Sequence, residues 1–269
     1  MPVPYRLRPA PTCLQVLLLL LPLWLVACTP TVGSGEFNAT TRMNDLNETL
    51  LADSPIKTVV IANVNIGTPS RNYLDKEAQR VDNQVAQYLT AQGYKVVSPR
   101  EFSQRWENAK LTYGDPVDPT TGRVNNKTFS QIMLSIRDQM RSQSKIDAFV
   151  FTDLIELEVT VSGGMNHVAR FDGVTRKPSL RGTGNGITSD FDWGRPAAAV
   201  SIQIAIFNME LQQVFAGVGG IDLTDAIDTR SGNSYIRRRD VLENDDYILE
   251  GVQLALHPLV AMKNWPGQP

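Results

Sequence analysis

Two glutamates, Glu156 and Glu158, are the residues best suited to paired acid–base chemistry in this sequence. They lie in the alternating run 155–161, so both side chains are expected on the same face of one strand. Paired carboxylates hydrolyse glycosidic bonds when one acts as an acid and the other as a base or nucleophile. Such enzymes hold the two groups across a cleft, whereas alternation alone predicts polar residues on a solvated strand face. We therefore expect a solvated face and keep a sugar hydrolase as an alternative.

Other kinds of catalytic or cofactor site lack the residues they need. The two histidines are His167 and His257, and the two cysteines are Cys13 and Cys28, which makes no cluster of metal ligands. The glycine run 182–186 lacks both the spacing of a dinucleotide site and a preceding strand, and no lysine follows it as in a phosphate-binding loop. We expect no catalytic, cofactor-binding or metal-binding residues and no enzymatic activity.

The charge of the chain bears on which kinds of partner it could bind. The formal net charge is -2, which argues against nucleic acid because a polyanion binder shows a basic excess. The one dense basic run, 237–239, has the chemistry to bind acidic lipid head groups or carboxylates. It stands beside Asp240 and Glu243, so a solvated charge run is the favoured interpretation.

The first residues have the pattern of an export signal. Arg6 and Arg8 precede the apolar run 14–25, which is too short and too interrupted for a membrane span. The following Leu25-Val26-Ala27-Cys28 resembles the lipobox of bacterial lipoproteins. That resemblance implies cleavage after residue 27, acylation (palmitate among the acyl groups) of Cys28 and a membrane anchor. Because Thr29 rather than aspartate follows the cysteine, it implies the outer membrane, facing the periplasm.

Composition divides the rest of the chain. Residues 28–56 are rich in small polar residues and predict a flexible lipidated tether. Residues 57–262 predict a single periplasmic domain, followed by a tail at 263–269. Apolar patterns within the domain predict strands at 58–64, 94–97, 146–161, 200–206 and 214–218. They also predict helices at 74–89, 102–109, 129–140 and 247–259. The second of these helices is expected to begin after a capping box at 98–101, and the third to be capped near 126–128.

These elements define an α/β fold, in which a mixed β-sheet packs with amphipathic helices. One antiparallel hairpin is expected near the C-terminus, with a loop at 208–213. A long, irregular insertion is expected at 162–196, since no strong pattern runs through it. Aromatic residues flanked by arginine are common anchors at interfaces, so this region and its surroundings supply the candidate partner-binding residues, which are Phe171, Phe191, Trp193, Arg195 and Tyr235.

The order of elements resembles one periplasmic group. A helix ending in Gly93-Tyr94-Lys95-Val96-Val97, a helix leading into 145–150, and a closing hairpin and helix are similar to the amino-terminal domain of TolB, the curli-secretion lipoprotein CsgG and the lipoprotein activators of penicillin-binding proteins. The resemblance covers roughly residues 57–260. It implies an α/β sandwich that acts as an interaction or assembly module for an envelope protein complex.

Two features of the resemblance leave alternatives open. Asn208-Met209-Glu210-Leu211 replaces the aspartate-threonine-glycine turn usual in the group, and Thr152-Asp153 stands where a small residue often follows the buried strand. A CsgG-like secretion-channel subunit is the first alternative, although the insertion shows little of the alternation expected of membrane-spanning strands. A cell-wall hydrolase using Glu156 and Glu158 is the second. A homo-oligomer is compatible with each of these roles.

Overall fold

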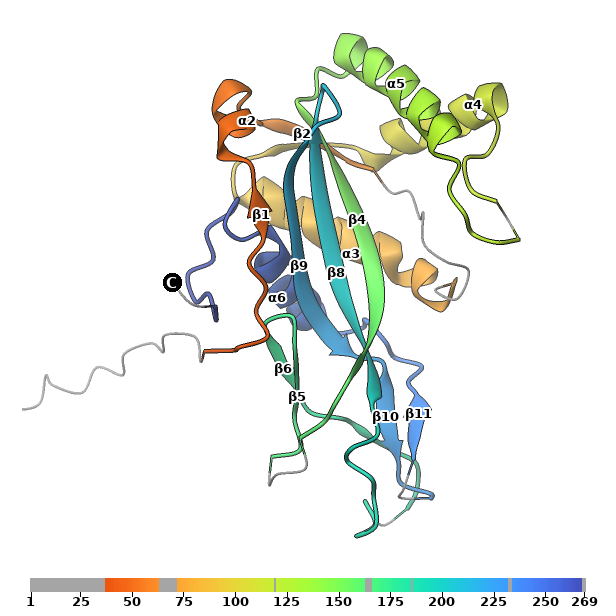
Figure 1. Ribbon diagram of the computed structural model, residues 1–269, viewed down its shortest axis with the longest axis vertical. Coiled ribbons are helices and arrows are strands. Elements are labelled where there is room, and N and C mark those ends of the chain that lie inside the picture. The colour runs from red at the N-terminus through yellow and green to blue at the C-terminus, as the bar shows by residue number, and fades with distance from the viewer. Residues whose placement is uncertain are drawn as a thin grey trace, which may run out of the picture. The chain divides into compact units, whose positions relative to one another are not determined.

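The computed structural model describes residues 37–62, 72–118, 120–162, 166–184, 186–231 and 234–267. The expected signal peptide and the expected acylation site, Cys28, lie outside these residues. The described part forms one compact unit, and its fold is mixed α/β as expected (Figure 1).

A six-stranded mixed sheet forms the centre of the unit, with strand order β1-β9-β8-β4-β2-β3. Strand β2 is parallel to its neighbours β3 and β4, whereas β4, β8, β9 and β1 run antiparallel to one another. The expected hairpin is formed by β8 and β9, joined by residues 209–212. The strand bounds are β1 Asp45–Leu46, β2 Thr58–Ala62, β3 Lys95–Val97, β4 Ala148–Val159, β8 Ala197–Asn208 and β9 Gln213–Leu223.

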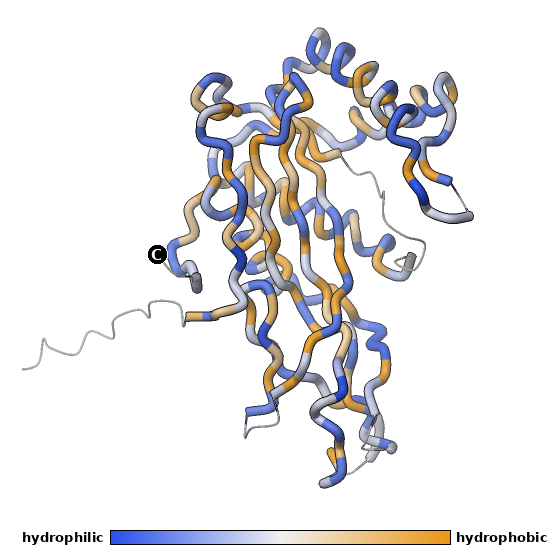
Figure 2. Tube along the Cα trace, in the orientation of Figure 1, coloured by the Kyte–Doolittle hydropathy of each residue, from blue (hydrophilic) through white to orange (hydrophobic). Residues whose placement is uncertain are grey.

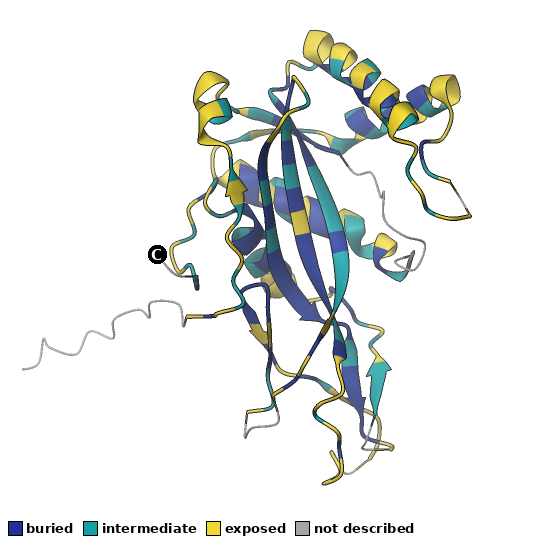
Figure 3. Cartoon of the chain, in the orientation of Figure 1, coloured by how far each residue is buried: buried dark blue, intermediate teal, exposed yellow. Residues whose placement is uncertain are grey.

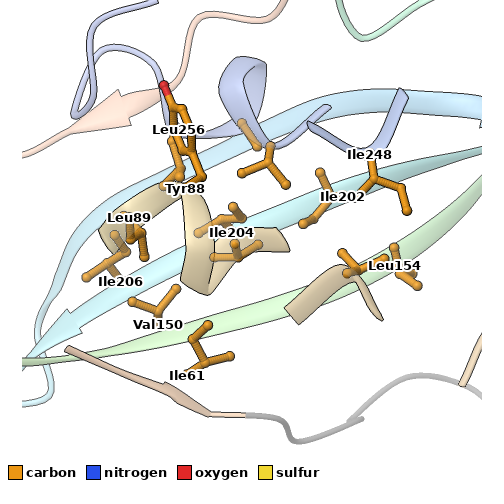
Figure 4. Close-up of a cluster of buried hydrophobic side chains, with 14 of the residues drawn as sticks. Ile61, Tyr88, Leu89, Val150, Leu154, Ile202, Ile204, Ile206, Ile248 and Leu256 are labelled. Carbon is orange, nitrogen blue, oxygen red and sulfur yellow. The ribbon is translucent and has the colours of Figure 1, made fainter. Parts of the chain in front are cut away.

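Helices α3 (Asn72–Ala91) and α6 (Asp245–Leu256) cover one face of this sheet. Their apolar stripes meet alternate residues of the strands, such as Val150, Ile202 and Ile204 (Figure 4). Helix α6 lies very close to β9, because a β-carbon on Gly219 would come within 2.0 Å of the Gly251 carbonyl oxygen. Both helices occupy the ranges that apolar periodicity predicted to within a few residues.

Helices α4 (Pro99–Tyr113) and α5 (Asn126–Gln143) pack on the opposite face of the sheet. They cover β2 and the start of β4, where Phe102, Trp106 and Phe149 share a second apolar core. Ser98 occupies the N-cap position of α4 as predicted, but its side chain makes no capping hydrogen bond, so the predicted capping box is wrong. Helix α5 is capped by Asn125.

The insertion 162–196 is not simply a long loop. Its described residues contain β5 (Ala169–Phe171) and β6 (Val174–Arg176), joined by Asp172 and Gly173 with φ of 40° and 89°. Positive φ at both residues is the geometry of a type I′ hairpin turn. Strand β7 (Leu180–Arg181) then pairs with β10 (Asp225–Asp228), which pairs with β11 (Tyr235–Arg237).

Residues 37–56 are not a flexible tether in the described part. They include β1, which pairs with β9, and helix α2 (Glu48–Asp53). The amide of Asn44 donates to the carbonyl oxygens of Leu254 (2.9 Å) and His257 (2.6 Å) and accepts from the Val218 amide nitrogen at 3.0 Å. The folded unit therefore begins at Phe37 rather than residue 57.

The C-terminal residues also belong to the folded unit as far as they are described. The Asn38 amide nitrogen donates to the Pro266 carbonyl oxygen at 2.8 Å. The indole of Trp265 stacks on the imidazole of His257, with ring centroids 4.1 Å apart. The expected tail at 263–269 is thus packed through residue 267.

Candidate interaction surface

The two glutamates considered for catalysis lie on the same side of β4, where the pairing with β8 is unbroken, but their surroundings differ. Glu156 lies on the α3 side of β4, where its carboxylate accepts a short hydrogen bond from the guanidinium of Arg237. The same guanidinium nitrogen donates to the Tyr73 hydroxyl (2.9 Å) and the Thr224 hydroxyl (2.6 Å). Burial and the contact with Glu156 raise the pKa of Tyr73. Glu158 is exposed and does not line the pocket that contains Glu156.

The basic run 237–239 is largely part of an ion-pair network. Arg238 is mostly buried and contacts the carboxylate of the buried Asp222 at 2.7 Å and that of Asp240 at 3.3 Å. Arg237 contacts Glu156, while Arg239 is exposed. Because two of the three guanidinium groups are matched by carboxylates of the same chain, the run is neither a simple solvated patch nor a concentrated positive charge.

The two histidines lie apart and stack on tryptophans. The imidazole of His167 lies 3.8 Å from the Trp193 ring and nearly parallel to it. Burial lowers the pKa of His257, which stacks on Trp265. Among the described residues, no group of three or more histidine, cysteine, aspartate or glutamate side chains is arranged to hold a metal ion.

Three of the candidate partner-binding aromatics, Phe191, Trp193 and Tyr235, pack against one another, and Phe171 lies in β5 beside Gly220 of β9. Phe171 and Phe191 are buried, which corrects the expectation that they are exposed anchors. The Phe191 ring contacts Trp193 (4.6 Å) and Tyr235 (5.2 Å), both of which are half-buried. Burial raises the pKa of Tyr235, and nearby Arg195 opposes that rise. Only Arg195 of the five is exposed.

A different surface was not predicted from the sequence. Among the described elements, α4 and α5 cover only part of the far side of the sheet and leave β4 beyond its start, β8 and β9 without a helix, in contrast to the side under α3 and α6 (Figure 3). Within this stretch, none of the outward-pointing side chains is buried. We call this surface the open face; its residues are Phe151, Asp153, Gln203, Ala205, Phe207, Ala216 and Val218.

The composition of the open face departs from that of an ordinary solvated sheet face. Antiparallel sheets with one wet face usually alternate apolar residues inward with polar residues outward. Here five of the seven outward side chains are apolar, the exceptions being Asp153 and Gln203. Figure 2 shows apolar residues running along β4, β8 and β9 rather than a strict alternation. An exposed apolar surface of this kind is typical of a binding site.

A pocket of about 620 Å³ lies where the open face meets α5. Its floor includes Phe151, Ala205 and Phe207, and its wall includes Met133 and Leu134 of α5. The volume and the apolar lining with a few polar groups match those of ligand sites in proteins. The complete lining is Phe129, Ser130, Met133, Leu134, Phe151, Thr152, Asp153, Gln203, Ala205, Phe207, Glu210 and Leu211.

A buried carboxyl group lies behind the pocket floor. Asp82 of α3 is 4% exposed, and its Oδ1 accepts a hydrogen bond of 2.5 Å from the hydroxyl of Thr152, a residue that also lines the pocket. Its Oδ2 has no hydrogen-bond partner among the described residues. Burial raises the pKa of Asp82 to about 6, although the bond from Thr152 acts in the opposite direction.

In comparisons with known proteins, the chain matches no protein-family model and no curated protein. Of the helices in the described ranges, none combines the length and the hydropathy of a membrane span.

Proposed function

We propose that this chain is a lipid-anchored, non-enzymatic interaction module of a bacterial envelope complex, and that it contacts its partner through the open face and the adjoining pocket. The observation that carries the proposal is the apolar character of a surface where a solvated sheet face would be polar. Attachment through Cys28 and an outer-membrane location rest on the lipobox resemblance.

The contact surface in this proposal differs from the insertion that the sequence favoured. Phe171 belongs to the third apolar core, and Phe191 is buried against Trp193 and Tyr235, so neither can act as an anchor without local unfolding. Phe151 and Phe207 of the open face are half-exposed and meet edge to face at 5.6 Å, so they present ordered apolar area to a partner. Rigid aromatic side chains of this kind dominate binding energy at interfaces.

In-cell chemical crosslinking followed by mass spectrometry tests the proposal. We expect one envelope protein to be recovered with the native chain, to be lost with Ala205→Lys, which places a charge in the pocket, and to be retained with Arg195→Ala in the insertion. If the crosslinked envelope protein is still recovered with Ala205→Lys but is lost with Arg195→Ala, the contact surface is the insertion and not the open face.

Anchoring has a separate test. Metabolic labelling with palmitate should mark the native chain, and Cys28→Ala should abolish the label and release the protein from the membrane fraction. A native protein that is unlabelled and recovered in the soluble fraction would contradict the lipid anchor while leaving the open face as a binding surface.

The two alternatives gain little support from the described residues. The hydrolase needs Glu156 as an acid or base, yet this carboxylate is already bound by Arg237. The secretion-channel alternative needs strands of about 9 to 11 residues from the insertion, whereas β5, β6 and β7 have three, three and two residues. We therefore favour the interaction module.

A further inference from the structure

Asp82 of α3 differs from the other buried aspartates of the described residues. Its Oδ1 accepts a hydrogen bond from the Thr152 hydroxyl, while its Oδ2 has no hydrogen-bond partner among those residues. Each of the other buried aspartates contacts an arginine, and these are Asp172, Asp222 and Asp228. A buried carboxylate without a cation or a full set of hydrogen bonds destabilises the fold when it is ionised. Packing alone therefore does not account for an aspartate at position 82.

The surroundings of Asp82 are apolar on the side of the sheet. Val150 and Leu154 flank Thr152 along the face of β4 that α3 covers, and both belong to the core (Figure 4). Ile204 of β8 pairs with Thr152 in the same core. The α3 residues one helical turn before and after Asp82 carry no charge, and they are Ala78, Gln79, Val85 and Ala86.

Charged side chains on the elements around Asp82 are paired elsewhere or exposed. Glu77 of α3 lies five residues before Asp82 and acts on the guanidinium of Arg80. Strand β8 carries no charged residue. The pairs on the neighbouring elements are Asp245 of α6 with Arg80, Glu250 of α6 with Arg176, and Glu156 of β4 with Arg237. The exposed groups are Lys95 of β3, Glu158 of β4 and Asp246 of α6.

The position of Asp82 determines which element responds when the carboxyl group ionises. Strand β4 is paired with β8 from residue 148 to 159, so its backbone is fixed within the sheet. Helix α3 meets β4 through side chains, and a small shift of the helix is sufficient to let water reach Oδ2. Burial raises the pKa of Asp82 to about 6, so the charge changes in mildly acidic to neutral conditions.

We propose that Asp82 is a pH-sensitive switch in the packing of α3 on β4. When protonated, it leaves the helix packed on the strand; when ionised, it loosens the middle of α3 and admits water to the contact. Thr152 stands between Phe151 and Asp153, which line the pocket of the open face, so the switch lies directly behind that surface. The inference does not depend on whether the open face binds a partner.

Native-state hydrogen exchange of the purified chain without its signal peptide tests the switch. Protection factors of the amides at 82–89, corrected for the intrinsic exchange rate at each pH, report the opening of α3. We expect the opening equilibrium to rise about tenfold between pH 5 and pH 8. This factor follows from a pKa of about 6 for packed Asp82 and about 3.9 for the solvated group.

Two variants assign the effect to the carboxyl group. Asp82→Asn does not titrate and should remove the pH dependence of α3 opening. Thr152→Val has nearly the same shape but lacks the hydrogen bond that lowers the pKa of Asp82, so the rise should extend to higher pH than in the native chain. This second variant keeps the test decisive if Asp82→Asn does not fold. Asp53→Asn, at an exposed position of α2, is the matched control and should behave like the native chain.

Helix α5 is the internal reference, because it packs in the other core on the opposite face of the sheet. Its amides should open alike in the native chain and in Asp82→Asn at each pH. The same tenfold change in α3 and α5 would mean that the whole unit opens rather than α3, and it would overturn the switch. An α3 opening that is constant with pH, or a pH dependence that persists in Asp82→Asn, would overturn it as well.

Discussion

Replacing Asp82 with asparagine should change how the stability of the domain depends on pH. Burial raises the pKa of Asp82 to about 6 in the folded protein, against about 3.9 for an aspartate in an unfolded chain. One pKa unit corresponds to about 1.4 kcal/mol. Ionised Asp82 therefore destabilises the folded state by about 3 kcal/mol relative to the protonated group.

The direction of this pH dependence follows from the raised pKa of Asp82 in the folded protein. Below about pH 4 the carboxyl group is protonated in both states, and the destabilisation is absent. It grows as the pH rises towards 6 and is complete above that value. Asparagine does not titrate, and its carbonyl oxygen keeps the acceptor for the Thr152 hydroxyl, which bonds Oδ1 at 2.5 Å. The difference in stability between Asp82→Asn and the native chain should therefore shift by about 3 kcal/mol in favour of the variant between pH 4 and pH 8.

Urea denaturation at several pH values between 4 and 8 measures this difference. Asp53→Asn is the control, because Asp53 is exposed on α2 and should leave the pH dependence unchanged. Parallel stability curves for the native chain and Asp82→Asn would refute the reasoning, since they would mean that Asp82 titrates alike in the folded and unfolded chain.

Three further predictions concern the contacts that hold the fold. Arg238→Ala should lower the free energy of unfolding by about 3–5 kcal/mol in urea, because it leaves Asp222, whose side chain is 7% exposed, without its charge partner; a loss below about 1 kcal/mol would show that the pair is solvated. Gly219→Ala should lower the melting temperature by several degrees in calorimetry, since its β-carbon would meet the Gly251 carbonyl oxygen at 2.0 Å; an unchanged value would mean that α6 shifts freely. Asn44→Ala should destabilise the unit by about 1–3 kcal/mol and speed hydrogen exchange along the edge of β9 that it caps; unchanged exchange would show that residues 37–56 do not hold that edge.

The regular elements could be predicted because their signals are local. The apolar residues of α3, α5 and α6 recur at helical spacing, and the run at 58–62 is continuous and β-branched. Burial against a sheet selects these patterns directly. The mixed sheet and the β8–β9 hairpin followed from the order of such elements.

Residues 37–56 were misinterpreted because composition does not report specific hydrogen bonds. The segment is polar, yet β1 pairs with β9, and the Asn44 side chain bonds α6 and β9 at residues more than 170 positions away. In the insertion, strands of two or three residues are too short to show a periodicity. Asp172-Gly173 between Phe171 and Val174 was a hairpin signal that could have been recognised.

The candidate site depends on pairings that sequence patterns do not encode. Glu156 contacts Arg237, which lies 81 positions further on in the sequence. Because this contact pairs the carboxylate with a positively charged guanidinium, the glutamate is not a free acid. The run Ala148-Phe149-Val150-Phe151 is apolar on both sides of the strand and was the sequence signal that indicated part of the open face. What the run could not reveal is that Phe149 is buried in the core beneath α4 and α5, where it contacts Phe102, while Phe151 stays half-exposed.

Site-specific photocrosslinking in living cells tests the central claim most directly. A photoreactive residue at position 134, on the pocket wall, should crosslink one envelope protein, and the product should disappear when Ala205→Lys is added. The same residue at position 111, which is 87% exposed on α4 and outside the pocket lining, should give no such product. Equal products from both positions, or a product at position 134 that persists with Ala205→Lys, would contradict the open face as the binding surface.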